Sequence, residues 1–296
     1  MHAPLTPFAD GGIDYGCYGR LLDFHLRNGA DGLAVPMHVG ESVSLTVEER
    51  KLLLEFALER VGGQIPVVAH VSEAGTANAA SLAQHAAKAG AAALIASVPY
   101  YWTPPQSMLI EHFAAIAEAG ALPFFVHNNP SEMAEVEFAT ASVIKLIERA
   151  PNFVGLIDSS LDWQYMIEAV QLARDARADF QFVSGTEYMI SASAIGATGM
   201  VSSLSGVCPH MVRRLYDLCR AEEYPAAREG QATLGKLSRL FARSGVPGLK
   251  AAARAMGRDC GDPRPPIPPL ARGEAVGLAE SLTAADSMHA EPRGWA

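Results

Sequence analysis

Three histidines stand at, or just after, the ends of short apolar runs, where side chains suited to proton chemistry are often placed. They are His38, His70 and His127. The imidazole of histidine titrates near neutral pH, so it moves a proton in either direction. Imidazoles also bind zinc and similar ions, and Glu41 and Asp158 supply carboxylates at equivalent places. The residue types therefore leave two chemistries open, acid–base catalysis and a metal site.

The elements that must position these histidines can be read from the apolar pattern. Short apolar runs bounded by Gly or Pro recur about every 30 residues, which is typical of strands buried on both faces. The expected strands are residues 3–6, 32–36, 66–70, 93–97, 123–127, 153–157, 180–184 and 199–202. Segments with helical periodicity lie between them, and a Thr46–Glu49 capping box opens one of these. The other expected helices are residues 76–89, 105–119, 138–149 and 163–177.

Strand and helix alternate eight times, which predicts an α/β fold of the (β/α)₈ TIM-barrel type, with a doubly wound sheet as the alternative. Residues 209–257 have the pattern of two or three helices with no strand between them, and the Pro-rich run 262–269 is unsuited to regular structure. We therefore predict a barrel over residues 1–208 and a C-terminal helical domain and tail over residues 209–296. Three large side chains are expected to line the pocket or pack between the layers, namely Met37, Trp102 and Trp163.

Composition excludes several classes of protein. The chain has 296 residues, of which 49% are hydrophobic, and a formal net charge of −9 with no basic cluster, so nucleic acid is not an expected partner. No run of 18 apolar residues predicts a membrane span. The four cysteines have no CxxC spacing, and the first residues do not resemble a signal peptide. These features predict a cytoplasmic protein.

Several short motifs resemble the dihydrodipicolinate synthase/N-acetylneuraminate lyase family, in the family's order. They are LTPF (5–8), SLTVEER (44–50), PYY (99–101), NNP (128–130), PNFVG (151–155), DSS (158–160) and GATG (196–199). The resemblance covers about residues 4–257. It implies a barrel with a C-terminal helical domain, assembled as a homo-oligomer (a dimer or a tetramer). We expect a small-molecule substrate and no cofactor.

The departures from the family pattern bear on the reaction. Family members form a Schiff base between a 2-oxo acid and a lysine at the end of the sixth strand, and the resemblance places Ile157 at that position. His127 stands in the place of a proton-relay tyrosine, and Glu132 in the place of a carboxylate-binding arginine. The carboxylate-binding loop Gly-Thr-Thr-Gly-Glu becomes MHVGE at 37–41. Tyr101, which in the family reaches the neighbouring subunit's site, is retained.

These features predict a lyase, hydratase or isomerase that acts on a small oxo- or hydroxy-compound without a lysine Schiff base. His127 is the expected general acid and base, assisted by Tyr101, His38 and His70. The expected substrate contacts are Val39, Gly40, Glu132, Ile157, Asp158, Gly185 and Val201.

Two alternatives stay open. The joint loss of the lysine, the carboxylate loop and the arginine is also expected of a non-catalytic ligand-binding or regulatory homologue. A metal-dependent hydrolase would use His38, His70 and His127 as ligands, although their spacings form no recognised local motif.

Overall fold

The structure, a computed structural model, describes residues 1–101, 103–242 and 244–295. Its contacts divide the chain into two compact units, Met1–Pro66 with Ser202–Ala296, and Val67–Val201. The expected division at residue 208 stays a prediction. Of the three large side chains expected in the pocket or between layers, Met37 is buried and Trp102 lies outside the described residues. Trp163 is 47% exposed, because it begins a helix at the surface.

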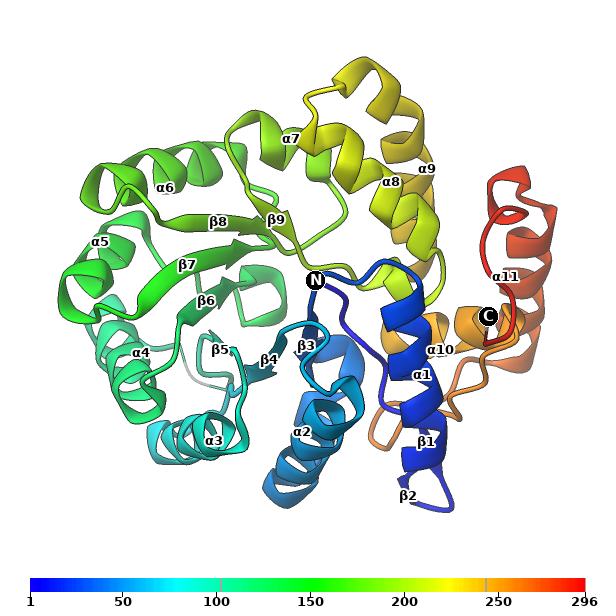
Figure 1. The fold of residues 1–296 in the computed structure, drawn as a ribbon, viewed down its shortest axis with the longest axis horizontal. Helices are drawn as coiled ribbons and strands as arrows, with labels where there is room; N and C mark the ends of the chain where they lie inside the picture. Colours follow the sequence, from blue (N-terminus) through cyan, green and yellow to red (C-terminus); the bar gives the residue numbers. More distant parts are fainter. Residues whose placement is uncertain (102, 243, 296) are drawn as a thin grey trace. The chain divides into compact units, whose positions relative to one another are not determined.

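The unit Val67–Val201 contains a parallel sheet with one strand following the next in chain order. Its strands are β4 (Val67–His70), β5 (Ala93–Ser97), β6 (Phe124–Asn128), β7 (Phe153–Asp158), β8 (Gln181–Ser184) and β9 (Gly199–Met200). The connecting helices are α3 (Thr76–Ala89), α4 (Gln106–Gly120), α5 (Thr140–Arg149), α6 (Trp163–Ala176) and α7 (Met189–Ala194). Helices α3 to α6 run along one side of the strands (Figure 1), so the sheet has a helix-facing side and an inner side.

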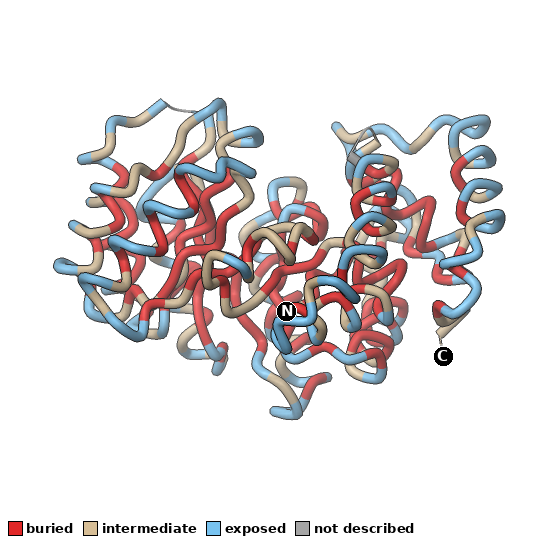
Figure 2. Tube along the Cα trace, turned by 90° about the horizontal axis from the view of Figure 1, so that it is seen from above, coloured by how far each residue is buried: buried red, intermediate tan, exposed pale blue. Residues whose placement is uncertain are grey.

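Aromatic rings fill the layer between these strands and helices. Phe113 of α4 contacts Phe124 of β6 with ring centroids 6.1 Å apart, and Phe124 in turn contacts Phe153 of β7 at 6.1 Å. The strands are continuous apolar runs because both of their faces are covered, and Figure 2 shows them buried while the outer sides of the helices are exposed. The core of this unit therefore lies between the strands and the helices that cover them.

The other unit begins with a short pairing in place of a full first strand. His2 forms isolated parallel bridges with Leu33 of β3 (Leu33–Val35) and with Ser202. The strand expected over residues 3–6 is absent, because Pro4 and Pro7 have no N–H with which to extend the pairing. The hairpin β1 (Phe8–Ala9) and β2 (Gly12–Ile13) follows.

Helices make up most of the remainder of this unit. They are α1 (Tyr15–Arg27), α2 (Val47–Val61), α8 (Pro209–Arg220), α9 (Tyr224–Ala242), α10 (Gly245–Ala255) and α11 (Arg272–Ala284). The predicted capping box opens α2: the Thr46 hydroxyl accepts from the Glu49 N–H at 3.1 Å, and the Glu49 carboxylate accepts from the Thr46 N–H at 2.9 Å. Helices α8 to α11 form the expected C-terminal helical part, and residues 259–271 between α10 and α11 are irregular.

Candidate active site

His127 lies in a row of side chains on the inner side of the sheet. It is the register partner of Ser97 on β5 and of Ile157 on β7, and Ile157 is the partner of Val183 on β8. Register partners in a parallel sheet point to the same face, so these four side chains lie side by side. Val126, the neighbour of His127 in sequence, points to the opposite face, the side on which β6 meets α4. The sheet therefore brings together two of the predicted site residues, His127 and Ile157.

Both ring nitrogens of His127 are near serine hydroxyls. Nδ1 lies 3.3 Å from the Oγ of Ser97, and Nε2 lies 2.9 Å from the Oγ of Ser159, which follows the end of β7. His127 and Ser97 are buried, whereas Ser159 is half-buried. An imidazole held between two hydroxyls has a fixed ring orientation, as a general acid or base requires. Ser97 and Ser159 are thus site residues that the sequence analysis did not select, although both were visible as polar residues at strand ends.

Gly185 leaves the space that the Ser159 hydroxyl occupies. A Cβ atom added at Gly185 would lie 2.0 Å from the Oγ of Ser159 and 3.1 Å from the carbonyl oxygen of Asp158. The N–H of Gly185 also donates to that carbonyl at 2.7 Å. The predicted site residue Gly185 therefore lies directly beside the contact between His127 and Ser159.

His70 is linked to the same row through a main-chain group. Its Nε2 lies 2.8 Å from the Oγ of Ser72, and this Oγ accepts a hydrogen bond from the backbone N–H of Ser97 at 2.6 Å. An amide N–H does not pass a proton onward as a hydroxyl does. Ser97 thus joins His70 and His127 structurally, through its backbone N–H on one side and its hydroxyl on the other.

Asp158 lies on the other face of β7. Its carboxylate accepts from the Asn128 side chain at 2.8 Å and from the Ser160 hydroxyl at 2.9 Å, and Asn128 in turn accepts from the Phe138 N–H at 2.9 Å. Burial raises the pKa of Asp158 to about 6, despite the hydrogen bonds from Asn128 and Ser160 that oppose the shift. The structure therefore does not bring this carboxylate to the side of the sheet that carries His127.

Tyr101 lies in the loop after β5, and Glu132 ends a short 3₁₀ turn (Pro130–Glu132) after β6. Tyr101 is 86% exposed and has a φ of 76°, a left-handed conformation that is strained for a large side chain. Glu132 is also exposed, and its carboxylate accepts from the Asn129 side chain at 2.6 Å. The last predicted contact in this unit, Val201, is buried, and its N–H donates to the Ser184 carbonyl at 2.8 Å.

The remaining predicted residues belong to the other compact unit. His38, Val39 and Gly40 form one short 3₁₀ turn, in which His38 is exposed and the other two are buried. The Gly40 carbonyl accepts from the Thr6 hydroxyl at 2.6 Å. Glu41, which follows, makes a buried ion pair with Lys250, with Nζ and Oε1 2.7 Å apart.

A metal site gains no support from the side chains. Within residues 1–101, 103–242 and 244–295, no group of three or more His, Cys, Asp or Glu is arranged to hold a metal ion. The assignment of His38, His70 and His127 as metal ligands stays a prediction.

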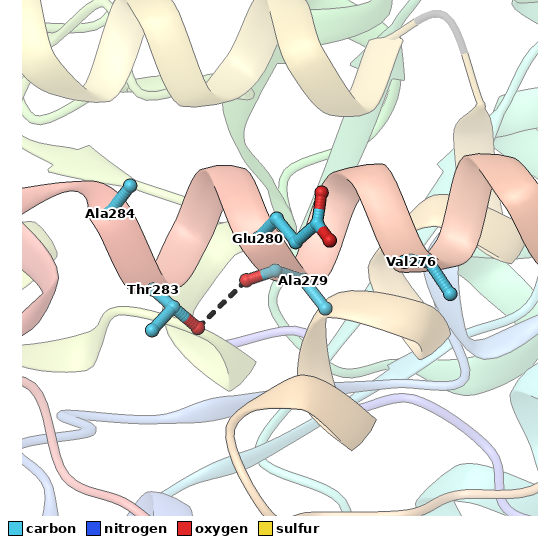
Figure 3. Close-up of a pocket in the computed structure, with 5 residues that line it drawn as sticks. All are labelled: Val276, Ala279, Glu280, Thr283 and Ala284. Carbon is cyan, nitrogen blue, oxygen red and sulfur yellow. Dashed lines mark hydrogen bonds between the residues drawn. The ribbon is translucent and has the colours of Figure 1, made fainter.

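Two shallow surface hollows lie elsewhere in the chain. One, of about 450 Å³, runs along the exposed face of α11 (Figure 3) and is lined by Val276, Ala279, Glu280, Thr283 and Ala284. The other, of about 460 Å³, is lined by Arg27, Asn28, Gly29, His210, Arg213, Arg214, Asp217 and Leu218. Neither contains a pair of groups comparable to His127 and Ser159. Over the described part of the chain, no helix has the length and apolar character needed to cross a membrane.

Parallel strands with helices outside them and acid–base side chains at the strand ends define an α/β-barrel type of site. Comparison with known proteins narrows this class. The sequence matches the dihydrodipicolinate synthetase family over residues 1–285. A 4-hydroxy-tetrahydrodipicolinate synthase of Mycolicibacterium paratuberculosis is 34% identical over 291 residues, 97% of this chain and 95% of that protein. The chain belongs to the dihydrodipicolinate synthetase family.

Further relatives agree with this assignment. A 4-hydroxy-tetrahydrodipicolinate synthase of Bartonella bacilliformis is 34% identical over 274 residues, 91% of this chain and 92% of that protein. The crystal structure of dihydrodipicolinate synthase from Aquifex aeolicus matches with a TM-score of 0.90 at 30% identity, covering 95% of each chain. The predicted family and the predicted α/β fold, a (β/α)₈ barrel with a C-terminal helical extension, are confirmed, as is the coarse assignment to the lyases of this family.

Proposed function

We propose that this chain is a lyase-type enzyme that acts on a small oxo- or hydroxy-compound by acid–base chemistry, without a lysine Schiff base. The observation that carries the proposal is the pairing of Ile157 with His127 in adjacent strands. Ile157 is fully buried in the row that also holds His127, and its side chain has no nitrogen with which to form an iminium. A reaction at this place cannot begin with an iminium at residue 157, and the paired side chain that can transfer a proton is that of His127.

The positions of the lysines support this proposal. All five lysines of the chain lie within the described residues, and none of them is on a strand. Lys88 and Lys145 are exposed on helices α3 and α5, and Lys250 is held in the buried ion pair with Glu41. The Lys250 amine is already engaged by two groups, because its Nζ also donates to the Asp262 carbonyl at 3.1 Å.

His127 is proposed as the general acid and base. Its contacts with Ser97 and Ser159 hold the ring at the carboxyl end of β6, where barrel enzymes place their reacting groups. Tyr101, His38 and His70 are proposed as assisting groups, and the exposure of Tyr101 suits a residue that reaches the site of a second copy in a homo-oligomer. The names of the curated relatives support a small oxygenated substrate.

Trapping with borohydride tests the absence of a Schiff base. The protein is incubated with pyruvate and sodium borohydride, and its intact mass is measured; a family member that carries the lysine serves as the positive control. We expect the mass of this chain to stay unchanged. A pyruvate-sized adduct would contradict the proposal, and repeating the reaction with Lys250→Met would show whether that buried lysine had reacted.

A further inference from the structure

The two ring nitrogens of His127 have serine partners that differ in exposure. Its Nδ1 faces the buried Ser97 hydroxyl at 3.3 Å, and its Nε2 faces the Ser159 hydroxyl at 2.9 Å. Of these two serines, only Ser159 is part-exposed. A small molecule at the end of the strands would therefore meet the Ser159 hydroxyl before it met the nitrogen behind it.

We propose that Ser159 is a catalytic residue that touches the substrate, and that His127 exchanges its proton with the substrate through the Ser159 hydroxyl. This inference rests on the proposed function and adds a second residue to it. The substrate class it suits is a small oxo-compound with a hydrogen on the carbon next to its carbonyl group.

The proton transfer balances without any additional reactant. The substrate carbon–hydrogen bond breaks, and its electron pair becomes that of an enolate. The released proton moves to the Oγ of Ser159 while the hydroxyl proton of Ser159 moves to Nε2 of His127, so the imidazole becomes an imidazolium. The return of a proton by the same path regenerates both residues.

This mechanism requires one tautomer of His127. Nε2 must be the acceptor in the resting state, so the ring proton is on Nδ1 and is donated to the Oγ of Ser97. Ser97 is thus a positioning residue that acts through His127. His70 is linked to Ser97 through the Ser72 hydroxyl and the backbone N–H of Ser97, and an amide N–H does not pass a proton onward.

Gly185 makes the arrangement possible. A Cβ at that position would lie 2.0 Å from the Oγ of Ser159, far inside van der Waals contact. Gly185 is outside the left-handed region, so an alanine there meets no backbone strain and acts only through crowding. The variant Gly185→Ala therefore displaces the Ser159 hydroxyl without deleting it.

Hydrogen–deuterium exchange of small oxo-compounds measures the proposed proton transfer directly. The wild-type protein and the variants Ser159→Ala, Gly185→Ala and His127→Gln are incubated in D₂O with hydroxyacetone, which is neutral, or with pyruvate. Loss of the signals of protons next to the carbonyl is followed by proton NMR. We expect exchange by the wild type and losses of about 10²-fold or more for Ser159→Ala and His127→Gln, the usual size of an acid–base contribution. Gly185→Ala should lower the exchange rate at least about tenfold, because the added methyl group displaces the Ser159 hydroxyl.

The outcomes separate this inference from the proposed function. Wild-type exchange rates in Ser159→Ala, together with loss of exchange in His127→Gln, would overturn the role of Ser159 and leave the proposed function intact. Full exchange in His127→Gln, or no exchange of either compound by the wild type, would contradict the proposed function itself.

The hydrogen bond between His127 and Ser159 can also be tested on the free protein, without any substrate. The nitrogen shifts of His127, recorded by ¹⁵N NMR, report which ring nitrogen carries the proton. We expect the Nδ1–H tautomer in the wild type and a changed tautomer balance in Ser159→Ala. Ser160→Ala is the matched control, because the Ser160 hydroxyl bonds to Asp158 on the other face and its loss should leave the His127 signals in place. A wild-type ring protonated on Nε2 would overturn the inference.

Discussion

Ile157 on β7 is the register partner of His127 on β6, so the two side chains are neighbours on the inner side of the sheet. By the family resemblance these are the places of the Schiff-base lysine and of the relay tyrosine. An apolar side chain and an imidazole stand there instead, and Ser159, two residues beyond Ile157, supplies the hydroxyl that meets the ring at 2.9 Å. Under the proposed function, this pairing places a proton-transfer group beside the position that the family resemblance gives to a nucleophilic amine.

Replacement of His127 by glutamine should abolish most of the proposed activity while the protein stays folded. Glutamine keeps hydrogen-bonding groups near Ser97 and Ser159 but does not titrate, so we expect turnover to fall by about 10²- to 10⁴-fold. The measurement is the rate of exchange of hydroxyacetone protons, with circular dichroism as the check on folding. His289→Gln, a change at an exposed histidine near the C-terminus, is the control and should keep the wild-type rate.

Much of the secondary structure was predictable from the sequence. The predicted strand 93–97 and helix 76–89 match β5 and α3 residue for residue, because buried strands of a parallel sheet are continuous apolar runs and Gly90 ends the helix with a φ of 93°. The ends of the other predicted strands and helices differ from the observed ends by at most two residues. The prediction of a first strand over residues 3–6 was wrong. The apolar pattern indicated a strand, but Pro4 and Pro7 have no N–H with which to pair.

The site was predictable in part, for physical reasons that concern side-chain direction. His127 and Ile157 were selected as strand-end residues, and strand pairing makes them neighbours. Ser97 and Ser159 were missed, because a serine at a strand end is common and only the register shows that it faces a histidine. Asp158 was selected for its charge, but the alternation of a strand turns it to the face opposite Ile157.

Gly155→Ala should destabilise the sheet beneath the site. A Cβ at Gly155 would lie 2.4 Å from a ring carbon of Phe125 and 2.7 Å from the Gln181 carbonyl oxygen, and neither neighbour is a flexible chain end. We expect the free energy of unfolding to fall by about 1–3 kcal/mol or more, as measured by urea denaturation. Gly230→Ala is the matched control: apart from its chain neighbours and the nearby backbone of helix α9, no atom lies within 4 Å of an added Cβ, so the helix should gain up to about 1 kcal/mol. Equal effects of the two changes would contradict the predicted crowding at Gly155.

The buried carboxyl of Asp158 should give the stability a specific pH dependence. Burial raises its pKa from 3.8 to about 6 in the folded protein, so between these values the folded state holds a proton that the unfolded state has lost. The contribution of Asp158 to the free energy of unfolding therefore falls as pH rises through that range, by about 3 kcal/mol in total.

Comparison with Asp158→Asn isolates this contribution from those of other titrating groups. The difference in free energy of unfolding, wild type minus variant, should decrease between about pH 3.5 and pH 7. Urea denaturation at a series of pH values measures it. A difference that rose with pH would mean that the hydrogen bonds from Asn128 and Ser160 dominate over burial.

The ion pair between Lys250 and Glu41 should be a structural element whose two members depend on each other. Both side chains are almost fully buried, the pair is 2.7 Å long, and the Lys250 ammonium also lies 4.4 Å from the centre of the Phe8 ring. Lys250→Met leaves the Glu41 carboxylate buried without its cation, so we expect a loss of about 3–5 kcal/mol in the free energy of unfolding.

A second change, Glu41→Gln, added to Lys250→Met removes that unpaired charge. The glutamine side-chain oxygen can still accept from the backbone N–H of Arg264, which bonds to Glu41 at 2.8 Å. The double variant should therefore be more stable than Lys250→Met alone, and a urea-denaturation cycle of the wild type, two single variants and the double variant measures the coupling. Strictly additive losses would show that the two charges do not stabilise each other.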